Sequence, residues 1–193
     1  MKYFPISLNV KDRRVTVIGG GHVAEQRIQE LLECDARVTV ISPEVTSTLE
    51  SLSDAGKIAV HLRAYESGDL ADSWVVLTAS DDPEVNAAAW HESREGKIPI
   101  NVADDPSKCD FIMPALVRRG DLTIAISTGG ASPALAARLR RHIASIVGPE
   151  YERLVEVLSR IRSRVKDSVS DEEERRQLTR AWMELRLPML LRL

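Results

Sequence analysis

The stretch VTVIGGGHVAEQ, residues 15–26, passes from β-branched apolar residues through three glycines directly into a helical pattern. A strand followed at once by the spacing G-x-G-x-x-A and a helix is typical of a dinucleotide-binding turn. In that arrangement Gly19 permits the tight turn, Gly21 leaves room for a pyrophosphate, and Ala24 lets the helix pack closely on its strand. Free N–H groups at the start of the helix attract negative charge. The stretch therefore predicts dinucleotide binding, with a glycine-rich turn that binds no ligand as the alternative.

The choice of cofactor depends on the end of the second predicted strand, in VTVISPEV, residues 38–45. Glu44 lies near the position at which an acid binds the ribose 2′-hydroxyl of NAD. No Arg or Lys follows within residues 42–51 to neutralise the 2′-phosphate of NADP, so NAD is favoured. Alternatively, Glu44 is a solvated loop acid and the backbone at Ser42 and Pro43 contacts the ribose. The remaining predicted cofactor-binding residues are Gly20, His22, Val23 and Thr78.

The rest of the chain predicts an α/β protein. Short β-branched runs alternate with amphipathic stretches, which indicates βαβ units and a Rossmann-like parallel sheet. In the first helical stretch, Val23, Ile28, Leu31 and Leu32 fall on one apolar stripe. The predicted strands are residues 14–18, 37–41, 57–62, 74–79 and 98–102, with one more at 122–127.

Beyond residue 127 the pattern is almost entirely helical. Ser132 is the predicted N-cap of a helix with Pro133 in its first turn, and Gly148-Pro149 breaks the helical pattern. Ser170 with Glu173 is predicted to form a capping box for a last helix. We expect a nucleotide-binding domain over residues 1–112, a smaller region over 113–147 and a helical C-terminal domain over 148–193.

Composition excludes several classes of protein. With 44% hydrophobic residues, 28% charged residues and a net charge of −3, the chain is neither disordered nor a globally basic nucleic-acid binder. The N-terminal sequence has no secretion signal and no later window is apolar enough to span a membrane, so we expect a cytoplasmic protein. Cys34 and Cys109 lie far apart without a metal-binding spacing, which predicts free thiols and no fixed metal site.

Four motifs in this order resemble one family. They are GGGHVAEQR (19–27), TASDDPEVN (78–86), NVADDPSKCDFIMPA (101–115) and STGGASPALAARLR (127–140). Over about residues 1–165 the chain resembles the sirohaem synthase family, specifically its precorrin-2 dehydrogenase module. The chain is too short to include the methyltransferase domain of the larger fused members.

The resemblance implies NAD-dependent oxidation of precorrin-2 to sirohydrochlorin, followed in some members by insertion of Fe(II). It also implies a homodimer formed through the region that follows the nucleotide-binding domain. The family's essential aspartate falls on Asp104, whereas the position of Asp105 need not be acidic. Removing a hydride and a proton from the macrocycle requires a base, and Asp104 is the candidate. The alternative is that the sequence DDP only makes a turn.

Precorrin-2 carries many carboxylates, so its binding requires positive charge on this acidic chain. The segment from residue 107 to residue 145 contains six basic residues and two acidic ones. The predicted substrate-binding residues are Arg118, Arg138, Ser127, Thr128 and Gly129. Alternatively, some of these arginines are solvated surface residues and the glycines only make a turn.

A second class of function is an NAD-sensing regulatory module without catalysis. Such a module needs the glycine turn but has no use for the motifs at residues 101–115 and 127–140. For this reason the enzyme hypothesis is preferred.

Overall fold

The computed structural model describes residues 3–178 and 180–181 of the 193-residue chain. The chain divides into two compact units, with the boundary between Ile112 and Met113. We describe each unit by itself. The further division expected at residue 147 stays a prediction.

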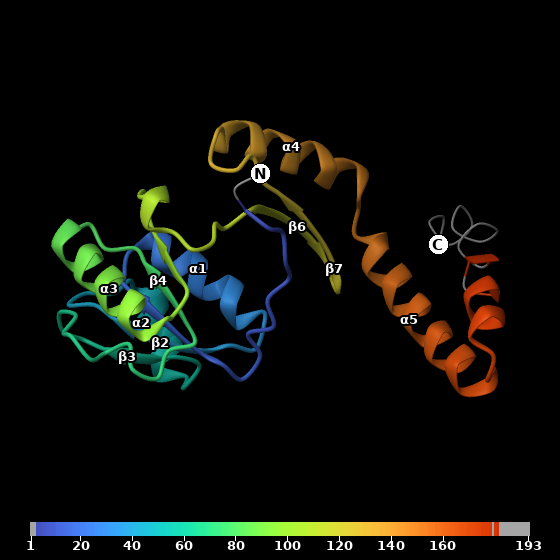
Figure 1. The fold of residues 1–193 in the computed structure, drawn as a ribbon, viewed down its shortest axis with the longest axis horizontal. Coiled ribbons are helices and arrows are strands. Elements are labelled where there is room, and N and C mark those ends of the chain that lie inside the picture. The colour runs from blue at the N-terminus through green and yellow to red at the C-terminus, as the bar shows by residue number, and fades with distance from the viewer. Residues whose placement is uncertain (1–2, 179, 182–193) are drawn as a thin grey trace. The chain divides into compact units, whose positions relative to one another are not determined.

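The first unit is a parallel α/β sheet with helices on both faces (Figure 1). Its five strands run in the order β3-β2-β1-β4-β5, and every pairing between neighbours is parallel. The predicted Rossmann-like fold is thus confirmed. The elements are β1 (Arg14–Ile18), α1 (His22–Leu32), β2 (Arg37–Ile41), α2 (Ser47–Asp54), β3 (Ala59–His61), β4 (Val75–Thr78), α3 (Pro83–Gly96), β5 (Ile100–Val102) and the 3-10 turn η1 (Pro106–Lys108).

Alternating strand residues build two cores, one on each face of the sheet. On one face Val15 and Val17 pack with Ile28 of α1 and Leu49 of α2. On the other face, residues of β1, β4 and β5 pack with Ala89 of α3. Helices on both faces account for the nearly continuous apolar runs of the central strands.

The first two strands match their predicted bounds, but the later ones are shorter than predicted. β3, β4 and β5 lose one or two residues at their ends because strand bounds depend on hydrogen bonding to a neighbour, which apolar runs do not reveal. Val23, predicted to lie on the apolar stripe of α1, is 57% exposed, so that prediction was wrong. Ala24, Ile28 and Leu31 are the residues of α1 that the sheet buries.

The second unit contains an antiparallel strand pair and two helices. The strands are β6 (Ala115–Arg119) and β7 (Leu122–Ile126), and the helices are α4 (Pro133–Ile146) and α5 (Glu150–Ser168). The side chain of Ser132 accepts a hydrogen bond from the N–H of Leu135 at 3.2 Å, which confirms the predicted N-cap. β6 was not predicted, because its two arginines interrupt the apolar pattern.

The helix predicted from Ser170 begins one residue later than its pattern indicates. Residues 172–178 are helical, and the side chain of Asp171, not Ser170, accepts the hydrogen bond from the N–H of Glu174 at 2.8 Å. Ser and Asp are equally good N-caps, so the sequence alone could not distinguish between the two neighbours. Within residues 3–178 and 180–181, no helix is both long and apolar enough to cross a membrane.

The connection from β3 to β4 depends on one carboxylate of α3. Glu92 accepts hydrogen bonds from the Tyr65 hydroxyl and from the N–H groups of Gly68 and Leu70. Burial, together with the hydrogen bond to Glu92, raises the pKa of Tyr65 well above its usual value, so its hydroxyl stays protonated. The three donors come from a segment without secondary structure, and Glu92 fixes them to the helix.

Replacing Glu92 with Ala is expected to lower the free energy of unfolding by about 2–3 kcal/mol, because charge-assisted hydrogen bonds are lost. Urea denaturation measures the change. The matched control is Glu95→Ala on the same helix, where the carboxylate is exposed and makes no hydrogen bond or ion pair among the described residues. A loss at Glu92 no larger than at Glu95 would contradict the anchoring role.

Candidate cofactor and catalytic site

The predicted cofactor residues and Asp104 come together at the carboxyl edge of the parallel sheet. The glycine turn follows β1, Ser42 follows β2, Thr78 ends β4 and Asp104 lies two residues beyond β5. Because the chain leaves β1 toward β2 on one side and returns at β4 on the other, a crevice is expected between β1 and β4. Ligands of open α/β sheets bind at such a switch point.

Two of the three glycines are required by their surroundings. Gly19 has a φ of 110°, and a Cβ there would lie 2.4 Å from the backbone oxygen of Ala79. A Cβ at Gly20 would lie 2.2 Å from the backbone oxygen of Glu44. At Gly21, by contrast, a Cβ would meet nothing within 4 Å. The turn thus packs tightly against neighbouring backbone at Gly19 and Gly20. It is open at Gly21, where the sequence predicts that the pyrophosphate binds.

The start of α1 fits an anionic ligand. Gly21 is its N-cap, and no side chain caps the N–H groups of its first turn. Such groups need an outside partner, and together with the helix dipole they favour a phosphate. His22 and Val23, both predicted to contact the cofactor, lie exposed in this turn. Their contacts with the cofactor stay predictions.

Thr78 adds a second feature that fits a cofactor. Its side chain is 2% exposed, and its hydroxyl oxygen is buried without a hydrogen-bond partner among the described residues. In the sheet register Thr78 lies between Ile18 of β1 and Val102 of β5. An unsatisfied hydroxyl at the switch point is expected where a bound group completes the hydrogen bonding.

The loop after β2 is fastened to the glycine turn by hydrogen bonds. The Thr46 N–H donates to the backbone oxygen of Gly20 at 3.0 Å, and its hydroxyl donates to Glu25 at 2.6 Å. The Ser42 hydroxyl donates to the backbone oxygen of Glu44 at 2.6 Å. The Glu44 side chain is exposed and has no partner in the described part of the chain, so both predicted modes of ribose contact remain open.

Asp104 is held in an unusual backbone conformation. Its φ is 61°, a region in which non-glycine residues are uncommon and Asp and Asn are the best tolerated. The neighbouring Ala103 N–H donates to the backbone oxygen of Thr78 at 3.0 Å, which fixes the end of β5 to β4. The carboxylate of Asp104 is exposed and makes no hydrogen bond or ion pair within residues 3–178 and 180–181. It is therefore available to a ligand.

Cys109, which the sequence predicts only to be a free thiol, and Asp110, which the sequence does not mark, fix the loop that follows Asp104. The Cys109 sulfur lies 3.2 and 3.3 Å from the backbone oxygens of Val102 and Asp105, and its single S–H is shared between these two acceptors. Asp110 accepts from the Ile100 N–H at 3.1 Å and pairs with Arg94 at 2.6 Å. No local pattern marks these roles, because each partner lies several residues away in the chain.

Asp105 has a structural role beside Asp104. It accepts hydrogen bonds from the hydroxyl and N–H of Ser107 and pairs with Lys108 at 3.0 Å. The Ser107 hydroxyl, followed by Lys108, lowers the pKa of Asp105 from 3.8 to about 2. The two adjacent acids therefore differ, since Asp105 is engaged by its own loop and Asp104 is not.

Asp105 is expected to make the stability of the protein depend on pH at the acid end. A carboxyl whose pKa is lower in the folded state stabilises the fold above its unfolded pKa, and this contribution disappears as the pH falls through the folded pKa. Asp105→Asn is thus expected to lower the free energy of unfolding at about pH 6, with a difference from the parent that shrinks between about pH 4 and 2. Urea denaturation across this range measures it, and a difference independent of pH would contradict the expectation.

In the second unit, the predicted substrate residues form a turn before α4. Ser127 accepts from the Gly129 N–H at 3.1 Å, and Thr128 accepts from the Ser132 N–H at 3.0 Å. Gly129 has a φ of 65°, so the turn itself requires this glycine. These contacts account for the turn without a ligand, and binding of substrate by these residues stays a prediction.

Not every basic side chain between residues 107 and 145 is available to a substrate. Arg119 donates to the backbone oxygens of Val147 and Ala144, at 2.9 and 3.2 Å, and so caps the C-terminal end of α4. Arg138 is exposed on α4, and Arg118 is half-buried on β6. Contact of Arg118 or Arg138 with substrate stays a prediction. Among the described residues, no group of three or more His, Cys, Asp or Glu side chains could hold a metal ion.

Comparisons with known families agree with the geometry of the first unit. The family model described as "Putative NAD(P)-binding" matches residues 6–115, and the model described as "Sirohaem biosynthesis protein central" matches residues 119–146. The chain is 35% identical to the "Siroheme synthase" of Nitrosococcus oceani over 91% of its own length and 38% of the relative's. It is 38% identical to the "Siroheme synthase" of Nitrosospira multiformis, over 92% of its own length and 38% of the relative's. The chain thus spans little more than a third of these relatives.

A solved structure named "SirC, precorrin-2 dehydrogenase" has a similar fold and a similar length. It superimposes with a TM-score of 0.81 at 26% sequence identity, covering 95% of this chain and 91% of that one. The resemblance to the sirohaem synthase family that the motifs indicate is confirmed by these matches. With its glycine turn at the switch point of a parallel sheet, the chain belongs to the NAD(P)-binding family matched by residues 6–115 and is a relative of the sirohaem synthases.

Proposed function

We propose that this protein is an NAD-dependent precorrin-2 dehydrogenase that produces sirohydrochlorin in sirohaem biosynthesis. The observation that carries the proposal is the position of Asp104, a carboxylate without a partner in the described part of the chain, at the same sheet edge as the glycine turn. Only β4 separates β1 from β5, so the two features lie two strand spacings apart, about 10 Å. The name of the similar SirC structure and the names of the relatives support the same reaction.

The residues of the first unit have separate tasks in this proposal. The backbone of Gly20 and Gly21 and the N–H groups at the start of α1 bind the pyrophosphate. Glu44, or the backbone of Ser42 and Pro43, contacts the ribose and selects NAD, because the loop offers no cation to a 2′-phosphate. Thr78 hydrogen-bonds the cofactor from the end of β4. When bound, NAD⁺ supplies the acceptor for the hydride that leaves precorrin-2.

Asp104 accepts the proton in the same oxidation. Precorrin-2 loses two hydrogen atoms, one as the hydride and one as a proton, and sirohydrochlorin, NADH and H⁺ are the products. The proton passes to the Asp104 carboxylate, which has no hydrogen-bond or ion-pair partner among the described residues, and then to water. In a subsequent insertion of Fe(II), the same carboxylate accepts pyrrole N–H protons. Fe(II) is then a substrate and the macrocycle supplies its ligands.

An assay of the purified chain with precorrin-2 and NAD⁺ tests the dehydrogenase by the appearance of NADH. Sirohydrochlorin with Fe(II), without NAD⁺, tests the chelatase separately. NAD binding without oxidation of precorrin-2 would overturn the enzyme proposal and favour an NAD-sensing module. A cytoplasmic location stays a prediction of the sequence.

We propose further that two copies of the chain form a homodimer through the second unit. Leu135, Leu139 and Ile146 are 48%, 38% and 61% exposed on α4, and their spacing places them on one helical face. An apolar face of this kind is typical of a subunit interface. Light scattering is expected to give twice the chain mass of 21.4 kDa, and Leu139→Glu is expected to shift the protein toward the monomer. A monomeric parent protein would overturn the proposal.

A further inference from the structure

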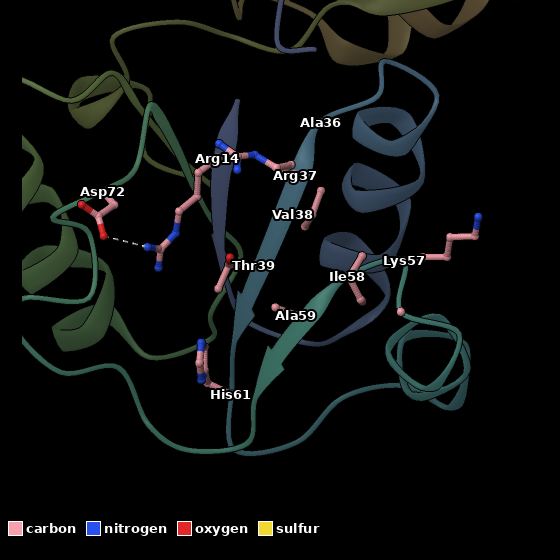
Figure 2. Close-up of a pocket in the computed structure, with 11 residues that line it drawn as sticks. Arg14, Ala36, Arg37, Val38, Thr39, Lys57, Ile58, Ala59, His61 and Asp72 are labelled. Carbon is pink, nitrogen blue, oxygen red and sulfur yellow. Dashed lines mark hydrogen bonds and ion pairs between the residues drawn. The ribbon is translucent and has the colours of Figure 1, made fainter. Parts of the chain in front are cut away.

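A hollow of about 710 Å³ opens on the first unit (Figure 2). It lies on the face of β1, β2 and β3 opposite to α1 and α2, which pack on these strands from the other side. Several of its side chains are charged or polar, which is unusual on the face of a parallel sheet, where apolar residues are the rule. Those that matter here are Arg14, Arg37, Thr39, His61 and Asp72.

The arginines of the hollow arise from a repeated strand sequence. β1 and β2 have the identical sequence RVTVI, and they pair in parallel so that each residue lies beside its counterpart. The valines of both strands face the helices. The alternation of a strand therefore places Arg14 beside Arg37, and Thr16 beside Thr39, on the opposite face. Neighbouring strands lie about 4.8 Å apart, so the backbones of the two arginines lie side by side at the amino ends of β1 and β2.

Like charges in this position repel each other and need a counter-anion. Asp72 pairs with one terminal nitrogen of Arg14 at 3.3 Å, but its own side chain is 84% exposed. Arg37 donates from Nε to the neutral backbone oxygen of Asp12 at 2.9 Å. Asp72 is the single carboxylate among the lining residues, and its ion pair is with Arg14.

Arg14 also lacks a partner for one of its donors. Its Nε is buried and makes no hydrogen bond among the described residues. A buried charged donor without an acceptor is costly, unless a bound group satisfies it. The hydroxyl of Thr39 and the imidazole of His61 line the same hollow as further hydrogen-bonding groups (Figure 2).

We propose that this hollow is a binding site for a small anion that carries carboxylate or phosphate groups, held between Arg14 and Arg37. The planar fork of arginine suits both groups, and the volume lies in the range of small-molecule sites. The two arginines lie at the amino ends of their strands, opposite to the cofactor edge. Arg14 begins β1 and the glycine turn follows its other end, four residues or about 13 Å away.

Nitrogen-15 NMR of the arginine side chains tests the site directly. The Nε resonance of Arg14 is assigned by its loss in Arg14→Lys, and the full-length protein is then titrated at constant ionic strength with citrate and, separately, with pyrophosphate. We expect at least one anion to shift this resonance with saturation. A shift with citrate alone identifies a carboxylate ligand. A shift with pyrophosphate alone identifies a phosphate ligand, and a shift with both anions shows that the site accepts either group.

Two variants distinguish a built site from a general effect of positive charge. Arg37→Gln is expected to weaken binding about tenfold, because one of the two guanidinium groups is lost. Lys57 also lines the hollow, but its side chain points away from the strands in Figure 2. Lys57→Gln removes the same charge and is expected to change the affinity less than about twofold. No saturable shift in the parent, or equal losses in both variants, would overturn the proposal. None of these measurements requires NAD or precorrin-2, so they are independent of the proposed enzyme activity.

Discussion

Asp104→Asn is expected to lower the rate of precorrin-2 oxidation by about 10²–10³-fold, because a positioned general base contributes this much to a proton transfer. Asn has nearly the same shape and tolerates the left-handed φ of 61° at this position. Fold and NAD binding should therefore be preserved. The change is measured as NADH formation at saturating substrate, with NAD affinity and thermal stability determined on the same protein.

Asp105→Asn is the matched control for this variant. It removes the same charge from the adjacent residue, but Asp105 is engaged by Ser107 and Lys108 of its own loop. We expect oxidation within about twofold of the parent and a modest loss of stability. If the Asp104 variant retained more than a tenth of the parent rate, the proton would have another acceptor. If both variants lost activity equally, the loop and not the Asp104 carboxylate would be responsible.

Gly19→Ala is expected to lower the free energy of unfolding by about 2–4 kcal/mol, since a Cβ is strained at positive φ and must displace a backbone oxygen. The φ of 110° and the 2.4 Å approach to the Ala79 oxygen are the structural reasons. Because β1 and β4 must move apart, NAD binding should be lost as well. Urea denaturation and calorimetric titration with NAD⁺ measure the two effects.

Gly21→Ala separates binding from folding at the same turn. A Cβ at Gly21 meets nothing within 4 Å, and the backbone has a φ of −79° that Ala adopts readily. Stability should change by less than about 0.5 kcal/mol, whereas the Kd for NAD⁺ should rise about tenfold or more because the methyl group occupies the place of the pyrophosphate. Unchanged NAD affinity in this variant would mean that the cofactor does not lie over the third glycine.

The local predictions succeeded where the signal is contained in a few neighbouring residues. The first two strands depend on the alternation of side chains, and the glycine turn depends on the φ angles that glycine allows. The Ser132 cap depends on a hydrogen bond to a residue three positions away. The errors occurred where neighbouring residues are equivalent in the sequence. Asp171 caps a helix in place of Ser170, and Val23 is exposed while Ala24 is buried. The difference in each case is a shift of one residue, which only packing or hydrogen bonding resolves.

By itself, the sequence predicted the α/β fold and the glycine turn after β1, and its resemblance to the sirohaem synthase family made Asp104 the candidate base. Only the tertiary structure decided that Asp104 has no partner among the described residues while Asp105 is engaged, that Arg119 caps α4, and that Arg14 lies beside Arg37. The physical reason is the range of the interactions. Turns and alternation are fixed by neighbours in the chain, but strand order and register bring together residues that are far apart in it, and these set the charge and hydrogen bonding of each site.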